Sequence, residues 1–321
     1  MSGYILAAIM KYVDFNLPTY VGEISENKKS IYFDEKFNEK IEPNSLPKEL
    51  KYLTFGWEFD QKIELNSLPE KLRYLVFGDE FNQKIEPDSL PKKLKYLTFG
   101  CEFNKKIEPN SLPENLTTLN FGYSFNKKIE PNSLPDKLLN LTFGNKFNRR
   151  IYPKSLSDKL ENLTFGYNFN KKIELNSLPE NLTTLTFGIN FNQKIKPDSL
   201  PENLTIITFG CDFDQKIDIE IFSSNTKIIF DWSDMLQFVT KDHIDMVNKI
   251  PNYYQVELYM YLVPEFGLKW PIHAINYDKQ SWPPKIYQVI KGYRHPKYDD
   301  IVVLINKKTY QPYSRAKSAL K

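Results

Sequence analysis

The chain has 321 residues, of which 41% are hydrophobic and 15% aromatic, and its formal net charge is only +3. This charge is too small to indicate a nucleic acid or an acidic surface as the partner. No stretch approaches the roughly 20 consecutive apolar residues of a membrane span, so we expect no membrane partner.

Residues 1–23 do not repeat, and we expect them to form a lead or N-terminal cap in which Ile5 to Tyr12 make a short helix. They lack the basic start of a signal peptide. A degenerate first repeat begins at Ile24, because Ile31 and Phe33 fall in phase with the apolar residues of later copies. Terminal repeats of a solenoid have a neighbour on one side only, and they are therefore atypical.

The central part of the chain repeats a 22-residue pattern, which reads LPKELKYLTFGWEFDQKIELNS in its first complete copy, Leu46 to Ser67. Later copies start at Leu68, Leu90, Leu112, Leu134, Leu156, Leu178 and Leu200. A fixed period without insertions is typical of a solenoid. We predict a β-solenoid of 22-residue coils with a parallel sheet over residues 24–230.

Each coil has its own pattern of apolar residues and turns. The predicted core positions of the first complete copy are Leu46, Leu50, Leu53, Phe55, Phe59 and Ile63. Because Leu53-Thr54-Phe55 alternates apolar and polar residues, we predict a short strand there. Gly56 is expected to end the strand by adopting a backbone conformation that other residues resist.

The repeats are predicted to stop near residue 230. Counting in steps of 22 brings Ile229 into phase with Ile207 and leaves Asp231 at the phenylalanine position. Residues 231–321 differ in composition, and we expect a small α+β domain or a C-terminal cap there. Its predicted elements are a helix over 241–250 and strands over 256–262 and 301–305.

The two cysteines, Cys101 and Cys211, occupy the same repeat position, five periods apart. If coils stack at about 4.8 Å, the thiols lie roughly 24 Å apart, which is too far for a disulfide. Two unpaired thiols favour a reducing compartment. We therefore expect an intracellular, cytoplasmic protein.

An enzyme would need a nucleophile with a base, or a set of metal ligands. The three histidines, His243, His273 and His295, all lie in residues 231–321 and show no HxxxH or HxH spacing. The sequence contains no glycine-rich phosphate loop and no GxSxG motif. We expect no catalytic site, metal or cofactor, and we keep an enzyme in residues 231–321 as an alternative.

Variable positions that point outward from the strand are the candidates for binding a partner. The position before the inward leucine provides Tyr52, Tyr74 and Tyr96, and the position after the glycine provides Trp57, Tyr123 and Tyr167. Tyrosine and tryptophan are favoured interface anchors, so we predict a protein-binding surface there. The alternative is that the tyrosines only stack across strands and stabilise the sheet.

A basic row follows the second half of each coil: Lys40, Lys62, Lys84, Lys106, Lys128, Arg150, Lys172, Lys194 and Lys216. In the middle of the row a second basic residue directly precedes each of four members: Lys105, Lys127, Arg149 and Lys171. Such a row could grip phosphates, but glutamates stand two residues after most of the lysines. We expect a self-neutralised, solvated face and consider a nucleic acid partner unlikely.

A repeated asparagine recurs as Asn38, Asn82, Asn104, Asn126, Asn148, Asn170 and Asn192, with Asp60 and Asp214 standing in. A ladder of polar ligand-binding groups is one interpretation. We expect instead that these side chains satisfy backbone groups of the turns inside each coil.

Phe103-Asn104, Ile107 and Pro109 spell the motif of the FNIP repeat family, and the surrounding LPENLTTL and PNSLP segments match its 22-residue pattern. The chain therefore resembles the FNIP repeat proteins of social slime moulds and giant amoeba-infecting viruses. The resemblance implies a curved, right-handed solenoid similar to leucine-rich repeats. In this family the repeats often follow an F-box, which implies recruitment of substrates to a ubiquitin ligase. Residues 1–23 are too short for a complete F-box, so Ile5 to Val21 would be a remnant.

These observations predict a non-catalytic scaffold that binds a protein partner on the sheet face of the solenoid. One alternative is a substrate-recruiting adaptor that contacts ubiquitin-ligase components. The other is an enzyme activity in residues 231–321.

Overall fold

The computed structural model describes residues 21–24, 29–215, 221–222, 226–232, 256–260 and 275–277. Several sequence-based predictions lie outside these residues: the helices over 5–12 and 241–250, the strand over 301–305 and the F-box remnant. The strand predicted over 256–262 is present as β12, Val256–Met260.

The described strands form one sheet of 13 strands, and their order in the sheet is their order in the chain. The strands are β1 (Val21–Ile24), β2 (Ser30–Phe33), β3 (Tyr52–Thr54), β4 (Tyr74–Val76), β5 (Tyr96–Thr98), β6 (Thr118–Asn120), β7 (Asn140–Thr142), β8 (Asn162–Thr164), β9 (Thr184–Thr186), β10 (Ile206–Phe209), β11 (Lys227–Trp232), β12 (Val256–Met260) and β13 (Ile275–Tyr277). Neighbours from β2 to β12 pair in parallel, whereas β1–β2 and β12–β13 pair antiparallel. This is the predicted β-solenoid with a parallel sheet.

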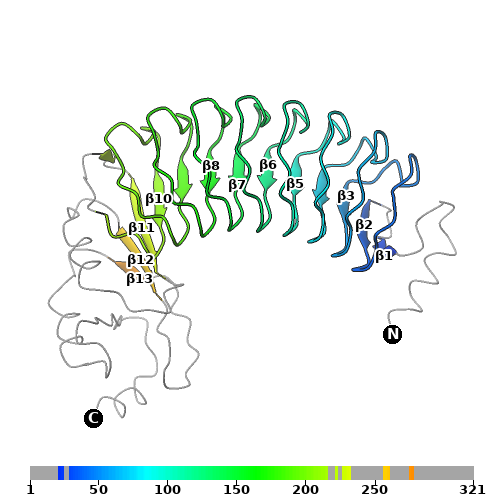
Figure 1. Cartoon of the computed structure of the whole chain (residues 1–321), viewed down its shortest axis with the longest axis horizontal. Helices are drawn as coiled ribbons and strands as arrows, with labels where there is room; N and C mark the ends of the chain where they lie inside the picture. Colours follow the sequence, from blue (N-terminus) through cyan, green and yellow to red (C-terminus); the bar gives the residue numbers. More distant parts are fainter. Residues whose placement is uncertain are drawn as a thin grey trace, which may run out of the picture.

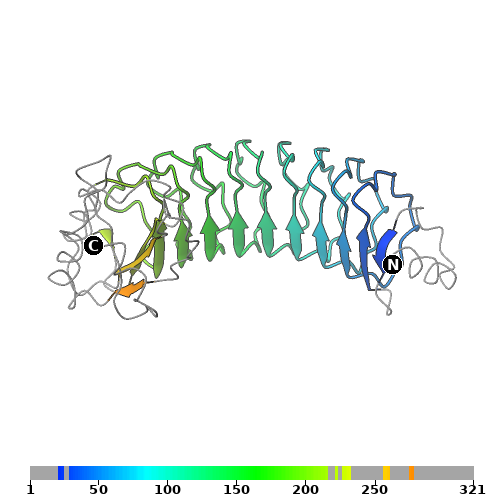
Figure 2. The ribbon, with the colours of Figure 1, turned by 90° about the horizontal axis from the view of Figure 1, so that it is seen from below.

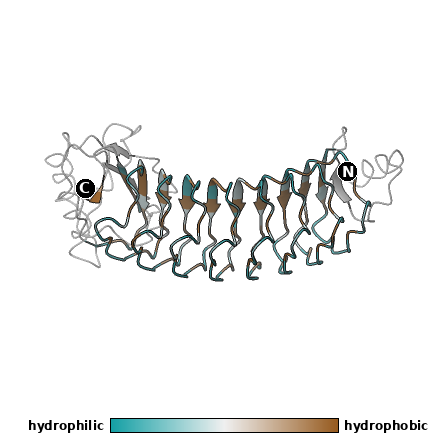
Figure 3. Ribbon diagram, turned by 90° about the horizontal axis from the view of Figure 1, so that it is seen from above, coloured by the Kyte–Doolittle hydropathy of each residue, from teal (hydrophilic) through white to brown (hydrophobic). Residues whose placement is uncertain are grey.

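The coils follow a curved path (Figure 1). Seen from below and from above, the strands lie along the inner side of the curve and the connecting loops along the outer side (Figures 2 and 3). The spacing of buried rings agrees with this curvature. The centroids of Phe99 and Phe121, which directly follow the strands, are 5.8 Å apart, while those of Phe103 and Phe125, farther along the coil, are 6.1 Å apart.

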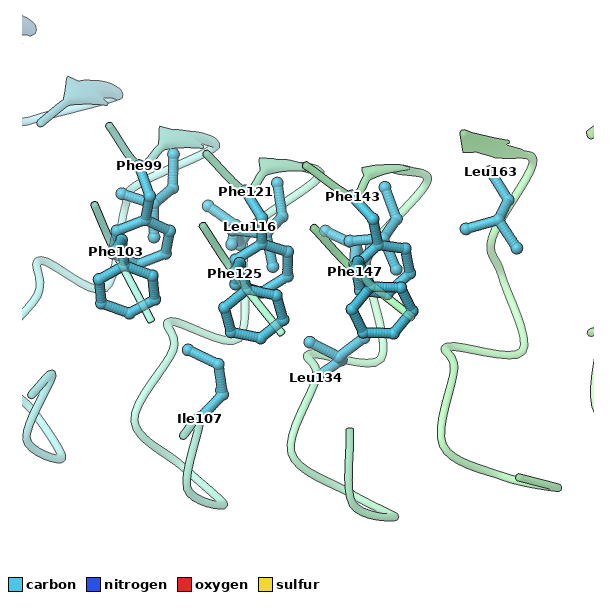
Figure 4. Close-up of a cluster of buried hydrophobic side chains, with 14 of the residues drawn as sticks. Phe99, Phe103, Ile107, Leu116, Phe121, Phe125, Leu134, Phe143, Phe147 and Leu163 are labelled. Carbon is cyan, nitrogen blue, oxygen red and sulfur yellow. The ribbon is translucent and has the colours of Figure 1, made fainter. Parts of the chain in front are cut away.

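The core consists of columns of equivalent side chains, because residues 22 positions apart lie side by side in neighbouring coils. Leu53, for example, pairs with Leu75. Two phenylalanines of one coil also stack on each other, with ring centroids 3.8 Å apart for Phe121 and Phe125. Figure 4 shows this double column of rings between the strands and the outer turns. The predicted core positions are buried in the described repeats, except Leu200, which is partly buried and packs against the core.

The glycine after each strand is required for a different reason from the one that the sequence suggested. Its φ is not in the left-handed region. Instead, the backbones of neighbouring coils lie close together here: a Cβ added to Gly122 would lie 1.7 Å from the carbonyl oxygen of Gly100. The equivalent contact recurs from Gly56 to Gly210. Close backbone approach, and not turn geometry, therefore excludes a side chain.

The left-handed conformation occurs elsewhere, at the residue before the serine in the outer turn. The residues with positive φ are Asn44, Asn66, Asp88, Asn110, Asn132, Lys154, Asn176 and Asp198, with φ between 57° and 63°. Asparagine and aspartate tolerate this region better than other residues that carry a Cβ. Lys154 is therefore the one residue of this set whose type does not suit its backbone.

We expect Lys154→Asn to stabilise the protein by roughly 0.5–1 kcal/mol, because the left-handed conformation costs lysine more than asparagine. Urea denaturation should show a higher midpoint with an unchanged slope. The reciprocal variant Asn176→Lys should lose a similar amount. If both variants kept wild-type stability, backbone strain at this position would be negligible.

The repeated asparagines form a ladder between coils and not, as predicted, within them. The backbone N–H of each residue donates to the side-chain oxygen of its equivalent in the preceding coil. Asn104 thus donates to Oδ1 of Asn82 and Asn126 to Oδ1 of Asn104, both at 3.0 Å. The ladder ties neighbouring coils together at the flank that follows the sheet, and it explains why aspartate can stand at position 60.

The phase predicted for the last coil is wrong by one residue. Ile207 pairs with Ile228, and Phe209 pairs with Phe230. Phe230 is fully buried, and its ring lies 5.7 Å from that of Phe209. This coil is one residue shorter than the others, so the phenylalanine column continues. The expected boundary at residue 230 falls inside β11, whose strand continues through Asp231 and pairs with β12.

Candidate functional site

Tyr52, Tyr74 and Tyr96 stand side by side on the outward face of β3, β4 and β5, and we call them the tyrosine stripe. The ring centroids lie 4.5 Å apart for Tyr52–Tyr74 and 4.3 Å apart for Tyr74–Tyr96, with nearly parallel planes. Tyr52 and Tyr96 are 41% and 39% exposed, and Tyr74 is half-buried between them. The stripe therefore has both expected features: stacking across strands and an exposed aromatic surface.

Tyr74, at the centre of the tyrosine stripe, is uncharged at neutral pH. Loss of water around the hydroxyl raises the pKa of Tyr74, and the hydrogen bond with Tyr96 and the proximity of Tyr52 raise it further. Since a tyrosine in water already has a pKa of about 10, Tyr74 keeps its proton at neutral pH.

A positive border adjoins the stripe at the N-terminal ends of its strands. Lys51, Arg73 and Lys95 directly precede the three tyrosines. Lys51 and Lys95 are exposed, and Arg73 donates a hydrogen bond from Nη1 to the carbonyl oxygen of Lys93 at 3.0 Å. In contrast, no outward position of the strands β3 to β10 carries a charged side chain. The sheet face is therefore uncharged, with a row of positive charge along one edge.

The sheet face changes character after the stripe, which the sequence analysis did not predict. From β6 to β9 its outward positions carry only threonine and asparagine. These side chains bond to one another across strands: Asn140 donates to Oγ1 of Thr118 at 3.3 Å, and Asn162 donates to Oδ1 of Asn140 at 2.7 Å. The sequence signal for this change is that only threonine and asparagine occupy the outward positions of these four strands.

The structure does not bring the other three predicted binding residues into the stripe. Trp57, Tyr123 and Tyr167 lie in the turns that follow their strands, and they are 59%, 47% and 45% exposed. They belong to separate coils, with Asp79 and Cys101 at the equivalent positions between the first two. Nζ of Lys146 lies 5.1 Å from the ring centroid of Tyr123. Trp57, Tyr123 and Tyr167 therefore lie apart from the stripe, and their role in binding a partner stays a prediction.

The ion pairs predicted for the basic row are present in most coils. The distances between Nζ and the carboxylate oxygen are 3.6 Å for Lys62–Glu64, 3.0 Å for Lys84–Glu86, 3.1 Å for Lys106–Glu108 and 2.9 Å for Lys128–Glu130. Glu130 accordingly raises the pKa of Lys128. The lysines of these pairs are exposed and the glutamates half-buried, so water screens the pairs, which neutralise charge and add little stability.

The repeats offer little for catalysis. Loss of water around the thiol raises the pKa of Cys101, and Asp79 raises it further, so the reactive thiolate is scarce at neutral pH. Among the residues that the structure describes, no group of histidine, cysteine, aspartate and glutamate side chains could hold a metal ion. His243, His273 and His295 lie outside them. Within the same part of the chain, no helix is long and apolar enough to cross a membrane.

One parallel strand per 22-residue coil, an asparagine ladder and continuous leucine and phenylalanine columns define the class of leucine-rich-repeat-like β-solenoids. The chain belongs to the FNIP repeat family, whose model, described as FNIP Repeat, matches residues 15–57, 59–102, 103–146, 147–190 and 191–231.

Among solved structures, the chain is similar to the crystal structure of CroV588, which is described as a novel circular LRR protein. The two share 40% sequence identity, with a TM-score of 0.61 over 71% of this chain and 36% of the CroV588 chain. The chain thus spans little more than a third of that protein's length. No curated protein shows significant similarity to it.

Proposed function

We propose that this chain is a non-catalytic scaffold whose sheet face binds a protein partner. The observation that carries the proposal is the uncharged outward face of the sheet, with the tyrosine stripe exposed at one end. The chain is rich in charged residues, at 26% overall, yet the outward positions of β3 to β10 carry none. Such a surface costs little to desolvate and suits a large contact.

The partner is expected to place an apolar or aromatic segment on Tyr52, Tyr74 and Tyr96. The stacked rings are already aligned, so few rotatable bonds are frozen when the partner binds. Acidic residues of the partner would face Lys51 and Lys95 at the border, where charge complementarity mainly raises the association rate.

The test is binding by wild type and by the triple variant Y52A/Y74A/Y96A. Partners are captured on the immobilised full chain from an amoebal lysate and identified by mass spectrometry, and a purified candidate is then titrated directly. Loss of a cluster of aromatic anchors should weaken binding at least 30-fold, which corresponds to about 2 kcal/mol or more.

The matched control is T118A/N140A/T184A, which truncates the same outward position in three coils beyond the stripe. This variant should retain most of the affinity. Circular dichroism checks that both variants fold. Equal affinity of the stripe variant and wild type, or equal loss in the two variants, would rule out the stripe as the centre of the interface.

A further inference from the structure

The middle coils carry a dense block of cations on the flank that follows the sheet. We define the cationic flank as Lys105, Lys106, Lys127, Lys128, Arg149, Arg150, Lys171 and Lys172. All are exposed except Lys171, which is half-buried. The first residue of each of these pairs has glutamine as its equivalent on both sides of the block: Gln61 and Gln83 before it, Gln193 and Gln215 after it. The doubling of positive charge is therefore confined to four adjacent coils.

The glutamates of the basic row neutralise only two members of this block, since Glu108 pairs with Lys106 and Glu130 with Lys128. Within the described residues, Lys105, Lys127 and Lys171 form no ion pair. Tyr152 replaces the glutamate that would face Arg150. Glu174, which was expected to pair with Lys172, lies 3.6 Å from Lys196 instead. The expectation of a fully self-neutralised face is therefore wrong in the middle of the solenoid.

The cations are regularly spaced. The buried phenylalanines just before them, Phe103, Phe125, Phe147 and Phe169, repeat with ring centroids 6.1 Å apart. The block therefore extends over four coils in three steps of about 6 Å, and each coil presents two cations, at least one of which is outside the ion pairs of the described residues. A flexible chain with one negative charge per unit could follow this arc from coil to coil.

Exposed aromatic rings accompany the cations in the same coils. Tyr123 and Tyr167 lie in the turns that lead into the flank, and Tyr152 lies two residues beyond Arg150; all three are between 42% and 47% exposed. Two of the rings already contact a cation: Nζ of Lys128 is 4.7 Å from the centroid of Tyr152, and Lys146 contacts Tyr123. Ser124, beside Tyr123, is buried and its hydroxyl has no hydrogen-bond partner within the described part of the chain.

We propose that the cationic flank binds single-stranded nucleic acid, with phosphates along the lysine and arginine rows and bases stacked on Tyr123, Tyr152 and Tyr167. Charge alone would also suit an acidic peptide, but aromatic rings interleaved with cations favour unpaired bases, which stack on aromatic side chains irrespective of sequence. A duplex would hide its bases from these rings. The surface is distinct from the tyrosine stripe, so the proposal does not depend on the protein-binding role of the sheet face.

The charge test measures fluorescence anisotropy of labelled, unstructured 20-nucleotide RNA and DNA with the full chain between 50 and 200 mM KCl. Wild type should bind with an affinity that falls steeply as salt rises. The variant K105Q/K127Q/R149Q/K171Q should lose at least tenfold in affinity at 50 mM. It should also flatten the slope of log K against log[salt] by about 3, because each phosphate contact to a single strand contributes roughly 0.7.

The glutamine variant is expected to fold, because glutamine already occupies these positions in other coils. There it donates to the asparagine ladder: Gln193 to Oδ1 of Asn170 and Gln215 to Oδ1 of Asn192, each at 2.8 Å. The matched control is K40Q/K62Q/K84Q/K194Q, which removes the same charge from the same flank outside the block. The control should keep wild-type affinity and salt slope.

The stacking test uses Y123A, Y152A and Y167A singly, each of which should weaken binding roughly 5- to 150-fold with little change in salt slope. Y52A/Y74A/Y96A should bind nucleic acid like wild type. Comparison of the RNA and DNA titrations shows which of the two nucleic acids binds more tightly. The proposal is overturned if wild type shows no salt-dependent binding, if the two charge variants lose affinity equally, or if poly-glutamate or a duplex binds more tightly than the single strand.

Discussion

Gly122→Ala should destabilise the solenoid by about 3–5 kcal/mol, although it adds only one methyl group. That methyl carbon would lie 1.7 Å from the carbonyl oxygen and 2.4 Å from the carbonyl carbon of Gly100. Both atoms belong to the backbone, so no rotamer change relieves the overlap. The two coils must move apart, which strains the hydrogen bond from Ser124 N–H to the Cys101 carbonyl oxygen, now 2.8 Å. Overpacking of this kind falls in the upper part of the range for single substitutions.

Urea denaturation followed by circular dichroism measures this effect as a lower midpoint, and thermal denaturation should show a decrease of roughly 6–20 °C. The control is Asn145→Ala in the next turn, where the equivalent residues include Trp57, Cys101 and Tyr123 and no glycine is needed. We expect the control to change stability by no more than about 0.5 kcal/mol. Wild-type stability of Gly122→Ala would contradict the close approach of neighbouring coils.

The period of the repeat was enough to predict the solenoid, because a core side chain in one coil must meet its equivalent in the next. The predicted solenoid of 22-residue coils is confirmed by the stacking of Phe99 on Phe121, whose ring centroids are 5.8 Å apart. The degenerate first repeat is confirmed in the same way, since Ile31 pairs with Leu53. Both outcomes depend on apolar residues that bury the same face in every coil.

The prediction of register from the 22-residue repeat failed where a coil has a different length. The last coil is one residue shorter, and burial of Ile228 and Phe230 sets its register. The role of the glycine was also missed, because a sequence does not show how closely two backbones approach. Strand pairing beyond residue 231 was not predicted for a related reason: β12 follows β11 after a long connection, which a 22-residue pattern cannot reveal.

The candidate sites were predictable only in part. The tyrosine stripe follows directly from the period, because Tyr52, Tyr74 and Tyr96 occupy one position of a strand in adjacent coils. The row of cations in the flank was visible in the sequence. The sequence did not show that several of these cations lack an ion pair with a glutamate. Whether Glu174 pairs with Lys172 or with Lys196 depends on side-chain directions at a turn, and sequence spacing does not determine these.

Phe125→Ala is the second substitution with a large expected effect, a loss of about 3–5 kcal/mol. The side chain is fully buried, and its ring stacks on Phe121 at 3.8 Å and lies 6.1 Å from both Phe103 and Phe147. Truncation removes contacts with its own coil and with both neighbours. A rigid stack cannot collapse to fill the space, because the hydrogen bonds of the sheet and the asparagine ladder fix the spacing of the coils.

Urea denaturation of Phe125→Ala should show a lower midpoint, measured beside Tyr123→Ala from the same coil. Tyr123 is exposed, and its ring contacts the side chain of Lys146, so its truncation should cost about 1 kcal/mol or less. Because stability in a solenoid depends on interfaces between neighbours, the equivalent substitutions Phe59→Ala and Phe191→Ala should cost about as much as Phe125→Ala. Equal costs for Phe125→Ala and Tyr123→Ala would show that the inward and outward faces of the coil have been assigned incorrectly.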